Sequence, residues 1–262
     1  MKNGVLVITD LEGISGISRM EQVSDHSAPG YADSLRLLMA DVNTAAAAAF
    51  DAGAMAVYVW DGHGNGYNFP EGTLDQRAVR IFEKDMMSVI PDVGAMLHIG
   101  AHAMAGTMTA FLDHTLSSVK IHNYCYNGKR FGELGIAGAF AGWFGIPCVA
   151  VSGDAAACAE AETFFPGVFT AAVKTATERN EAVCLDEQQA RALIYDAVKN
   201  GIENRDQIRP YRLERPYTVT VEYNRADYCD EVCREKPYVR RLDARTVTAT
   251  KTDVSGYYGL WL

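Results

Sequence analysis

Two carboxylates stand where the first apolar segment of the sequence ends. Asp10 follows residues 5–9 directly, and Glu12 comes two positions later in a glycine-rich stretch. Negative charges at this spacing repel each other unless a positive charge lies between them. Taken alone, the pair can also be a turn acid followed by an acid near the start of a helix. The alternative with chemical consequences is a divalent cation held by both side chains.

Histidines follow two further apolar segments. His63 lies in the loop DGHGNG after residues 56–60, and His102 follows residues 95–99. Carboxylates and imidazoles together suit zinc or a similar divalent ion. The glycines of DGHGNG could instead bind a phosphate through backbone amides, but the loop matches neither the dinucleotide-binding nor the P-loop pattern. His102 in isolation would more often be a hydrogen-bonded core residue.

The alternation of strands and helices predicts how these side chains meet. Short apolar segments that we expect to be buried strands are residues 5–9, 56–60, 95–99 and 148–152. Helices are expected at residues 34–51, 132–144, 154–164 and 187–200. This order predicts an α/β fold with a mainly parallel sheet and helices on both faces, in three layers. Ligands in such sheets bind beyond the carboxyl ends of the strands, where the acids and histidines would converge.

The C-terminal part of the sequence has a different character. Asn127 and Gly128 are a strong turn signal and predict a hairpin between residues 119–126 and 129–131. Alternating patterns and many charges predict strands at residues 217–223 and 246–250. We therefore expect a domain of residues 1–210 that carries the metal site. Residues 211–262 would form a smaller α+β, strand-rich extension packed on that domain.

The composition predicts a protein that binds neither nucleic acid nor membranes. The chain of 262 residues has 33 acidic against 24 basic residues and a formal net charge of -9. Nucleic-acid binding relies on Lys and Arg to neutralise phosphates, and no basic cluster is present. The N-terminal apolar run ends at Asp10 and is too short for a signal peptide or a membrane span. We therefore expect a cytoplasmic location.

The six cysteines are scattered through the chain and are expected to be reduced thiols. Cys229 and Cys233 form the one pair whose spacing could hold a metal ion. Because no second Cys or His pair follows at zinc-finger spacing, a structural zinc is not expected there.

Four further polar residues near these motifs can each have an ordinary structural role. Glu133 falls at the predicted start of a helix, where the helix dipole favours an acid. His114, in FLDHTLSS, is a lone loop histidine. Asp61 either fixes the tautomer of a ligating histidine or ends its strand as a turn acid. His98, inside the third apolar segment, is expected to be a core or interface histidine.

Five motifs in a fixed order resemble the zinc-dependent D-aminopeptidase family. They are TDLEGISG, the WDGH loop, GAHAMAGT, the DHT that follows it, and NGKRFGELGIAGAFAGW. This set covers roughly residues 1–155, and SGDAAACAEAE with AAVKTATERNEAVCL extends it to about residue 185. Residues 211–262 contribute little to the resemblance beyond overall length.

The resemblance implies a binuclear site with two zinc ions per subunit. The matching ligands are Asp10, which would bridge the ions, and Glu12, His63, His102 and Glu133. Which terminal ligand binds which ion stays open. His114 matches a histidine that acts in catalysis, as a proton shuttle to the leaving amine or as a donor to the oxyanion. Five ligands with one shared carboxylate leave positions for a bridging hydroxide and the substrate.

The activity implied is that of a metallo-aminopeptidase. It would release N-terminal (D-)amino acids from short peptides or amino acid amides by attack of the metal-bridging hydroxide. The preference for D-residues and a ring-shaped homo-oligomer, with a decamer as one candidate, come from the resemblance alone. A two-metal phosphoesterase is an alternative, for which Lys129 and Arg130 are the nearest basic residues to Glu133. The other alternative is a non-catalytic metal-binding protein.

Overall fold

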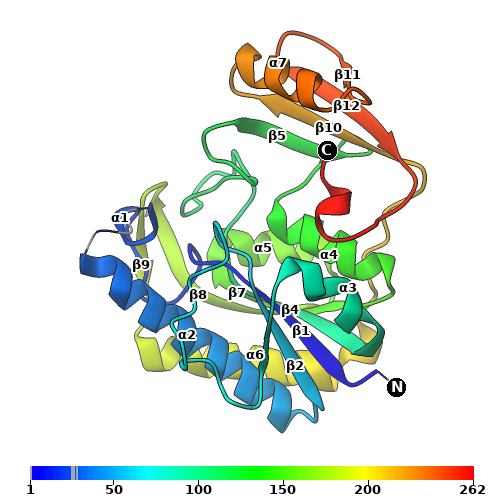
Figure 1. Cartoon of the computed structure of the whole chain (residues 1–262). Helices are drawn as coiled ribbons and strands as arrows, with labels where there is room; N and C mark the ends of the chain where they lie inside the picture. The colour runs from blue at the N-terminus through cyan, green and yellow to red at the C-terminus, as the bar shows by residue number, and fades with distance from the viewer. Residues whose placement is uncertain (1, 25–26, 28) are drawn as a thin grey trace.

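The computed structural model describes residues 2–24, 27 and 29–262 and arranges them around two β-sheets (Figure 1). The larger sheet has seven strands, which in spatial order are β3 (Val79–Ile81), β2 (Ala56–Asp61), β1 (Gly4–Thr9), β4 (Val93–Ala101), β7 (Cys148–Asp154), β8 (Phe169–Glu178) and β9 (Glu181–Cys184). Every neighbouring pair is parallel except β8 and β9. The predicted, mainly parallel sheet is confirmed.

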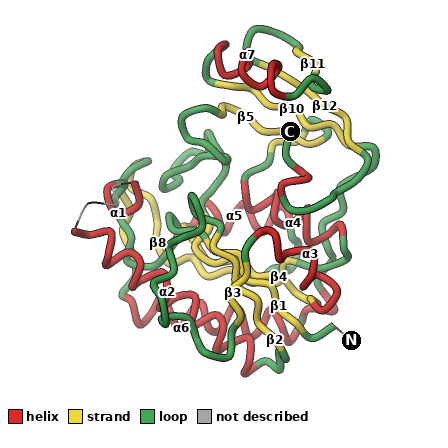
Figure 2. Tube along the Cα trace, viewed as in Figure 1, coloured by secondary structure: helices red, strands yellow, loops and turns green. Residues whose placement is uncertain are grey.

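Helices cover both faces of this sheet (Figures 1 and 2). One face carries α2 (Pro29–Asp51) and α6 (Glu187–Glu203), and the other carries α4 (Glu133–Trp143) and α5 (Ala155–Phe164). Residues of β1 alternate between the two cores: Val7 packs with the side of α2 and α6, and Leu6 with the side of α4 and α5. This alternation explains the continuous apolar run of a strand that is buried on both faces. The three-layer prediction is confirmed.

The shorter helical elements connect these layers. They are α1 (Glu21–Ser24), α3 (Met86–Val89) and the 3₁₀ turns Glu83–Asp85, Ile90–Asp92, Arg205–Gln207 and Tyr258–Leu260. A membrane-spanning helix is not found in the described part of the chain, because no helix there combines the required length with the required apolarity.

The second sheet is antiparallel and lies above α4 (Figure 1). Its strands, in spatial order, are β11 (Arg240–Arg241), β12 (Thr246–Lys251), β10 (Tyr217–Tyr223), β5 (Ile121–Tyr126) and β6 (Lys129–Arg130). The β5–β6 hairpin turns at Asn127 and Gly128, whose φ angles of 49° and 78° match the predicted turn. The division at residue 210 stays a prediction, but this sheet takes two strands from the middle of the chain.

Each strand and helix predicted from the sequence is present, and the structure adds elements that were not predicted. These are β3, β8, β9, β11, the short helices and α7 (Ala226–Glu235). All six cysteines are free thiols. Cys229 and Cys233 lie one turn apart on α7, and neither belongs to a metal-capable group among the described residues.

The small residues of α4 allow close packing within the chain. Gly138 and Gly142 face Phe165 and the backbone of Tyr211, respectively. A Cβ atom at Gly142 would lie 1.7 Å from the carbonyl oxygen of Tyr211, and one at Gly138 would lie 2.1 Å from the Phe165 ring. The glycine-rich helix therefore packs against its own subunit at these positions.

We expect Gly142→Ala to destabilise the protein, although alanine is the better helix former. The methyl group would overlap the Tyr211 carbonyl, which costs about 1–3 kcal/mol, against a gain in helix propensity of up to about 1 kcal/mol. Urea denaturation of both proteins measures the difference. The control is Gly30→Ala in α2, whose Cβ would have no neighbour closer than 3.8 Å. Equal stabilities for the Gly142 variant and the unmodified protein would contradict the packing.

Candidate metal centre

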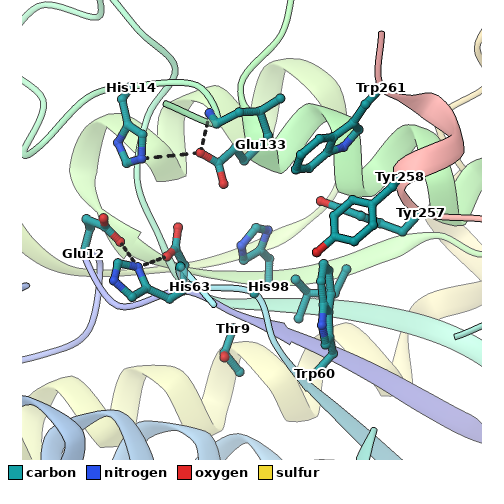
Figure 3. A pocket seen from close by; sticks show the side chains of 15 residues that line it. Thr9, Glu12, Trp60, His63, His98, His114, Glu133, Tyr257, Tyr258 and Trp261 are labelled. Carbon is teal, nitrogen blue, oxygen red and sulfur yellow. Dashed lines mark hydrogen bonds and ion pairs between the residues drawn. The ribbon is translucent and has the colours of Figure 1, made fainter. Parts of the chain in front are cut away.

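The carboxyl ends of three neighbouring strands form the base of the site (Figure 3). In β1, Thr9 is in register with Asp61 of β2 and with Ile99 of β4. The next residue, Asp10, donates its backbone N–H to the carbonyl oxygen of Ile99 at 2.9 Å. The parallel register therefore brings the loops that follow β1, β2 and β4 to one edge, as the sequence predicted.

Two glycines allow the loops after β1 and β4 to touch. Gly13 donates its N–H to the carbonyl oxygen of Gly100 at 2.8 Å, and Gly100 has a φ of 83°. A Cβ at Gly100 would lie 2.2 Å from the carbonyl oxygen of Asp10, and one at Gly13 would lie 2.1 Å from that of Ala101. Any side chain at either position would push the two loops apart and separate the acids from His102.

Asp10 lies between two groups of side chains, and each of its carboxylate oxygens faces one group. Its Oδ1 is 3.0 Å from Nδ1 of His63, and the same nitrogen is 3.0 Å from Oε2 of Glu12. Its Oδ2 is 3.2 Å from Nε2 of His102, which in turn is 3.4 Å from Oε1 of Glu133. The five residues named as ligands by the sequence therefore lie in one cluster, although the ligand assignment itself stays a prediction.

His114 lies beside this cluster, against Glu133 and His102. Its Nε2 is 3.6 Å from Oε1 of Glu133, and its ring stacks on that of His102 with a centroid distance of 3.9 Å. The ligand atoms of His102, His114 and Glu133 lie within 4.8 Å of one another. His114 is therefore close enough to serve either as a ligand or as a group that exchanges protons with a bound substrate.

Backbone carbonyls fix which ring nitrogen is available on two of the histidines. Nδ1 of His102 is 3.0 Å from the carbonyl oxygen of Ala103, and Nδ1 of His114 is 2.9 Å from that of Leu112. Because a carbonyl oxygen only accepts, each Nδ1 carries the proton and each Nε2 keeps its lone pair in the neutral ring. Leu112 has a φ of 52°, an unusual conformation for a branched residue that holds its carbonyl toward His114.

The acids and imidazoles shift one another's pKa values. Burial opposes the charging of His63, but the charge of Glu12 and the close contacts with Asp10 and Glu12 raise the pKa of His63 to about 11. Burial would lower the pKa of His102, but its close contacts with Asp10 and Glu133 raise it well above its usual value. Burial would raise the pKa of Glu133, but its close contact with His102 and the nearby positive charge lower it to about 2. Without a metal ion, protons on the imidazoles balance the carboxylates.

The donor set fits zinc. Ligand atoms at about 2.0–2.1 Å from a tetrahedral zinc ion lie roughly 3.3 Å apart, and the cluster's nitrogen–oxygen separations are 3.0 to 3.4 Å. Oε2 of Glu12 and Nε2 of His102 are buried and lack a partner with hydrogen-bond geometry. Buried polar atoms without such partners are costly unless they bind an ion or water. This arrangement is what ligands of a common cation would show.

Two buried ionisable residues, Lys174 and Glu160, hold the ligand loops in place, and neither was predicted from the sequence. Lys174 of β8 donates to the carbonyl oxygens of Glu12 at 2.7 Å and Ile17 at 2.6 Å. Burial lowers the pKa of Lys174 to about 8. Glu160 of α5 accepts a hydrogen bond from the N–H of Met104 at 2.8 Å, just beyond His102. A lysine within an alternating apolar stretch, residues 169–178, was the signal for the first of these contacts.

Asp61 and His98 have roles that differ from those of ligands. The Asp61 carboxylate accepts hydrogen bonds from the N–H and side-chain amide of Asn68, at 2.6 and 3.1 Å. Asn68 also donates to the carbonyl oxygen of His63, so Asp61 shapes the loop and shows no contact with a histidine ring. His98 is buried, as expected, and burial lowers its pKa to about 4. It lies at the base of the cavity as a neutral imidazole.

The cluster opens into a cavity of about 210 Å³. Its remaining walls include Trp60 and three residues of the C-terminal segment, Tyr257, Tyr258 and Trp261, for which the sequence predicted no role (Figure 3). Among the described residues that line it there is no Lys or Arg. Lys129 lies over the ring of Phe164, and Arg130 contacts the carbonyl oxygen of Ala105. The basic residues before Glu133 therefore lie outside this cavity.

Known proteins resemble this chain in both sequence and fold. The Peptidase M55 family model, described as D-aminopeptidase, matches residues 1–262. A D-aminopeptidase of Bacillus subtilis (strain 168) is 32% identical over 209 residues, which cover 77% of this chain and 74% of the relative. A solved structure is described as Zn-dependent D-aminopeptidase DppA from Bacillus subtilis, a self-compartmentalizing protease. It is 25% identical, with a TM-score of 0.89 over 97% of this chain and 94% of that one.

We expect zinc binding to release protons near neutral pH. The pKa of His63 is raised to about 11 and that of His102 is raised well above its usual value, so both rings are protonated in the metal-free protein near neutral pH. Zinc binds the neutral ring, so each displaced proton makes the affinity rise about tenfold per pH unit. Calorimetric titration in buffers of different ionisation enthalpy counts the protons, and His63→Gln should release about one fewer. A zinc affinity that does not change with pH would contradict this electrostatic balance.

Proposed function

The chain belongs to the Peptidase M55 (D-aminopeptidase) family and is a metallo-aminopeptidase, and we propose that its active site holds two zinc ions that share Asp10. The support for this proposal is the orientation of one carboxylate. Oδ1 of Asp10 faces His63, and Oδ2 faces His102. A carboxylate with a different ligand pair on each side is suited to bridging two cations.

The same geometry supports one division of the terminal ligands. Glu12 and His63 would hold one ion together with Oδ1 of Asp10, and His102 and Glu133 would hold the other together with Oδ2. Each ion would then have three protein ligands, which leaves positions open for water and substrate. The sequence could not make this division, because it depends on which oxygen of Asp10 faces which loop.

When bound, the two ions would acidify a water molecule and polarise the carbonyl of the scissile amide. His114 is the residue of this chain best placed to move a proton. Its Nδ1 is held by the carbonyl oxygen of Leu112, so Nε2 lies beside Glu133 with its lone pair free and could take a proton from the water and pass it to the leaving amine. The N–H of Leu116 donates to Oε1 of Glu133 at 2.8 Å and orients that carboxylate.

The substrates would be short peptides or amino acid amides with a free N-terminal residue, preferentially of the D configuration. The relatives described above are D-aminopeptidases, which supports this preference. The solved relative is a self-compartmentalizing protease, and we extend a ring-shaped homo-oligomer to this chain, with a decamer as one candidate. Such a ring would limit access to small substrates. The cytoplasmic location also stays a prediction.

The two alternatives from the sequence have less support. A phosphoesterase would need basic side chains to bind phosphate oxygens, and the described lining of the cavity provides no Lys or Arg. A non-catalytic metal-binding protein does not agree with membership of a peptidase family over residues 1–262.

We expect about two zinc ions per chain by elemental analysis of the zinc-loaded protein, and less than one in Asp10→Ala. Loss of the shared carboxylate removes a ligand from both ions, whereas His63→Ala should mainly weaken the ion held with Glu12. Asp33→Ala is the control, because Asp33 lies on the exposed side of α2, paired with Arg36. Full zinc content in Asp10→Ala would contradict the proposed bridge.

We expect His114→Ala to lower kcat for hydrolysis of D-alanyl p-nitroanilide by about 10²–10⁴-fold while zinc content is kept. The control is His122→Ala, since His122 is exposed and does not line the cavity. The same assays with the L-anilide and with p-nitrophenyl phosphate test the substrate class. Loss of zinc in His114→Ala would instead make His114 a ligand, and preferential cleavage of the phosphate would contradict the proposed activity.

A further inference from the structure

The end of the chain returns from the second sheet to the metal centre. After β12 the chain passes Tyr257, whose side chain is buried against Trp60 of β2 and Phe140 of α4, at ring distances of 4.6 and 5.4 Å. Chain termini are usually poorly ordered unless they are tied down by packing and hydrogen bonds. This segment packs directly on β2, which precedes His63, and on α4, which begins at Glu133.

Hydrogen bonds from the second sheet hold the same segment. The hydroxyl of Tyr124 accepts from the N–H of Leu262 at 2.8 Å, and the hydroxyl of Tyr126 donates to the carbonyl oxygen of Leu260 at 3.1 Å. Lys251 donates to the carbonyl oxygens of Gly259, at 3.0 Å, and Trp261. The side chains of residues 257–261 are therefore presented by an anchored backbone.

Four aromatic rings form one wall of the cavity, which we call the aromatic wall: Trp60, Tyr257, Tyr258 and Trp261. Trp60 packs edge to face on Tyr257. Tyr258 packs edge to face on Trp261, with a ring-centroid distance of 4.6 Å and an angle of 71° between the ring planes. In Figure 3 this wall faces His63, Glu12 and His114 across the cavity. The cavity thus has a polar half with the metal ligands and an apolar half with the rings.

The aromatic wall is open to a bound molecule. Tyr258 is 48% exposed, although large apolar surface is normally buried. The side chains of Ile8 and Leu116 also line the cavity and extend its apolar surface.

We propose that the aromatic wall binds the side chain of the substrate's N-terminal residue and makes the enzyme favour large apolar or aromatic residues at that position. This inference rests on the proposed aminopeptidase function. With the scissile carbonyl at the metal ligands, the side chain next to it extends into the other half of the cavity. An apolar cavity of about 150 Å³ can hold a benzene ring, and the whole of this cavity, with its polar half included, measures about 210 Å³. The polar half would meanwhile receive the amide and the N-terminal amine.

The aromatic wall would give residues 257–261 a role in substrate specificity. Edge-to-face contacts with Tyr258 and Trp261 would stabilise binding of a substrate side chain that has an aromatic ring, whereas a methyl group would leave part of the wall exposed to water. The proposed specificity residues are thus Tyr258 and Trp261, with Tyr257 and Trp60 supporting them.

The test compares D-phenylalanyl and D-alanyl p-nitroanilides, and the matching L-anilides, as substrates. We expect the unmodified enzyme to prefer the phenylalanyl substrate in kcat/KM. Trp261→Ala and Tyr258→Ala should each lower kcat/KM for it by about tenfold or more, mainly through KM, and change the alanyl value less than about threefold. Trp261→Phe should keep most of the preference. The control is Tyr238→Ala, because Tyr238 is 60% exposed and lies outside the cavity.

A binding measurement separates this inference from the proposed activity. Trp60 and Trp261 are two of the three tryptophans and line the cavity, so free D-phenylalanine and D-alanine can be titrated by fluorescence without turnover. Tyr258→Ala serves here because it leaves both of these fluorophores in place, and its zinc content confirms an intact site. Tighter binding of D-phenylalanine that is lost in Tyr258→Ala supports the pocket even if neither anilide is cleaved, in which case only the proposed activity fails. Equal affinity for the two amino acids, or a preference unchanged in Trp261→Ala and Tyr258→Ala, overturns the inference.

Discussion

The site depends on an electrostatic constraint: buried carboxylates gather within a few ångströms and must find positive charge. Asp10 and Glu12 are almost inaccessible to water, and Nε2 of His102 lies between Asp10 and Glu133. Burying unpaired charges costs several kcal/mol per ion, so this cluster can form only around cations. Protonated His63 and His102 supply that charge in the metal-free protein, and zinc would replace their protons. The lowered pKa of Glu133 and the raised pKa of His63 are two consequences of the same balance.

A scaffold that brings repelling groups together must resist their separation. Backbone contact between Gly13 and Gly100 prevents the two principal loops from moving apart, and the buried Lys174 ties the Glu12 loop to β8. On the other side, Glu133 occupies the first turn of α4, where the helix dipole stabilises its charge. These restraints come from the backbone and from residues, such as Lys174, whose side chains would not bind a metal ion. Substitutions far from the metal can therefore alter its affinity.

The sequence predicted the parts of the fold that have strong periodicity. Asp10, His63 and His102 follow β1, β2 and β4, which are short apolar segments ended by glycine or polar residues. The α/β topology then requires the ends of these strands to converge. β8 escaped prediction because its alternation is interrupted by Lys174, a charge that is stable in the interior only because two carbonyl oxygens accept from it. Asp61 was ambiguous because its partner, Asn68, lies in a loop with no periodicity. Residues 257–261 had no sequence pattern that predicted their place in the cavity, because that place depends on tertiary contacts.

The two sheets position different parts of the site, so the parallel sheet alone does not bring all of its residues together. Asp10, Glu12, His63 and His102 follow strands of the larger sheet. His114 precedes β5, and Glu133 follows β6, so both are attached to the hairpin of the second sheet, as is the terminal segment through Tyr124 and Tyr126. Glu133 is the first residue of α4, which packs on β4 and β7, so its separation from Asp10 is set by how α4 packs on the larger sheet. The second sheet instead holds the terminal segment, because Tyr124 and Tyr126 of β5 are hydrogen-bonded to Leu262 and Leu260 on either side of Trp261.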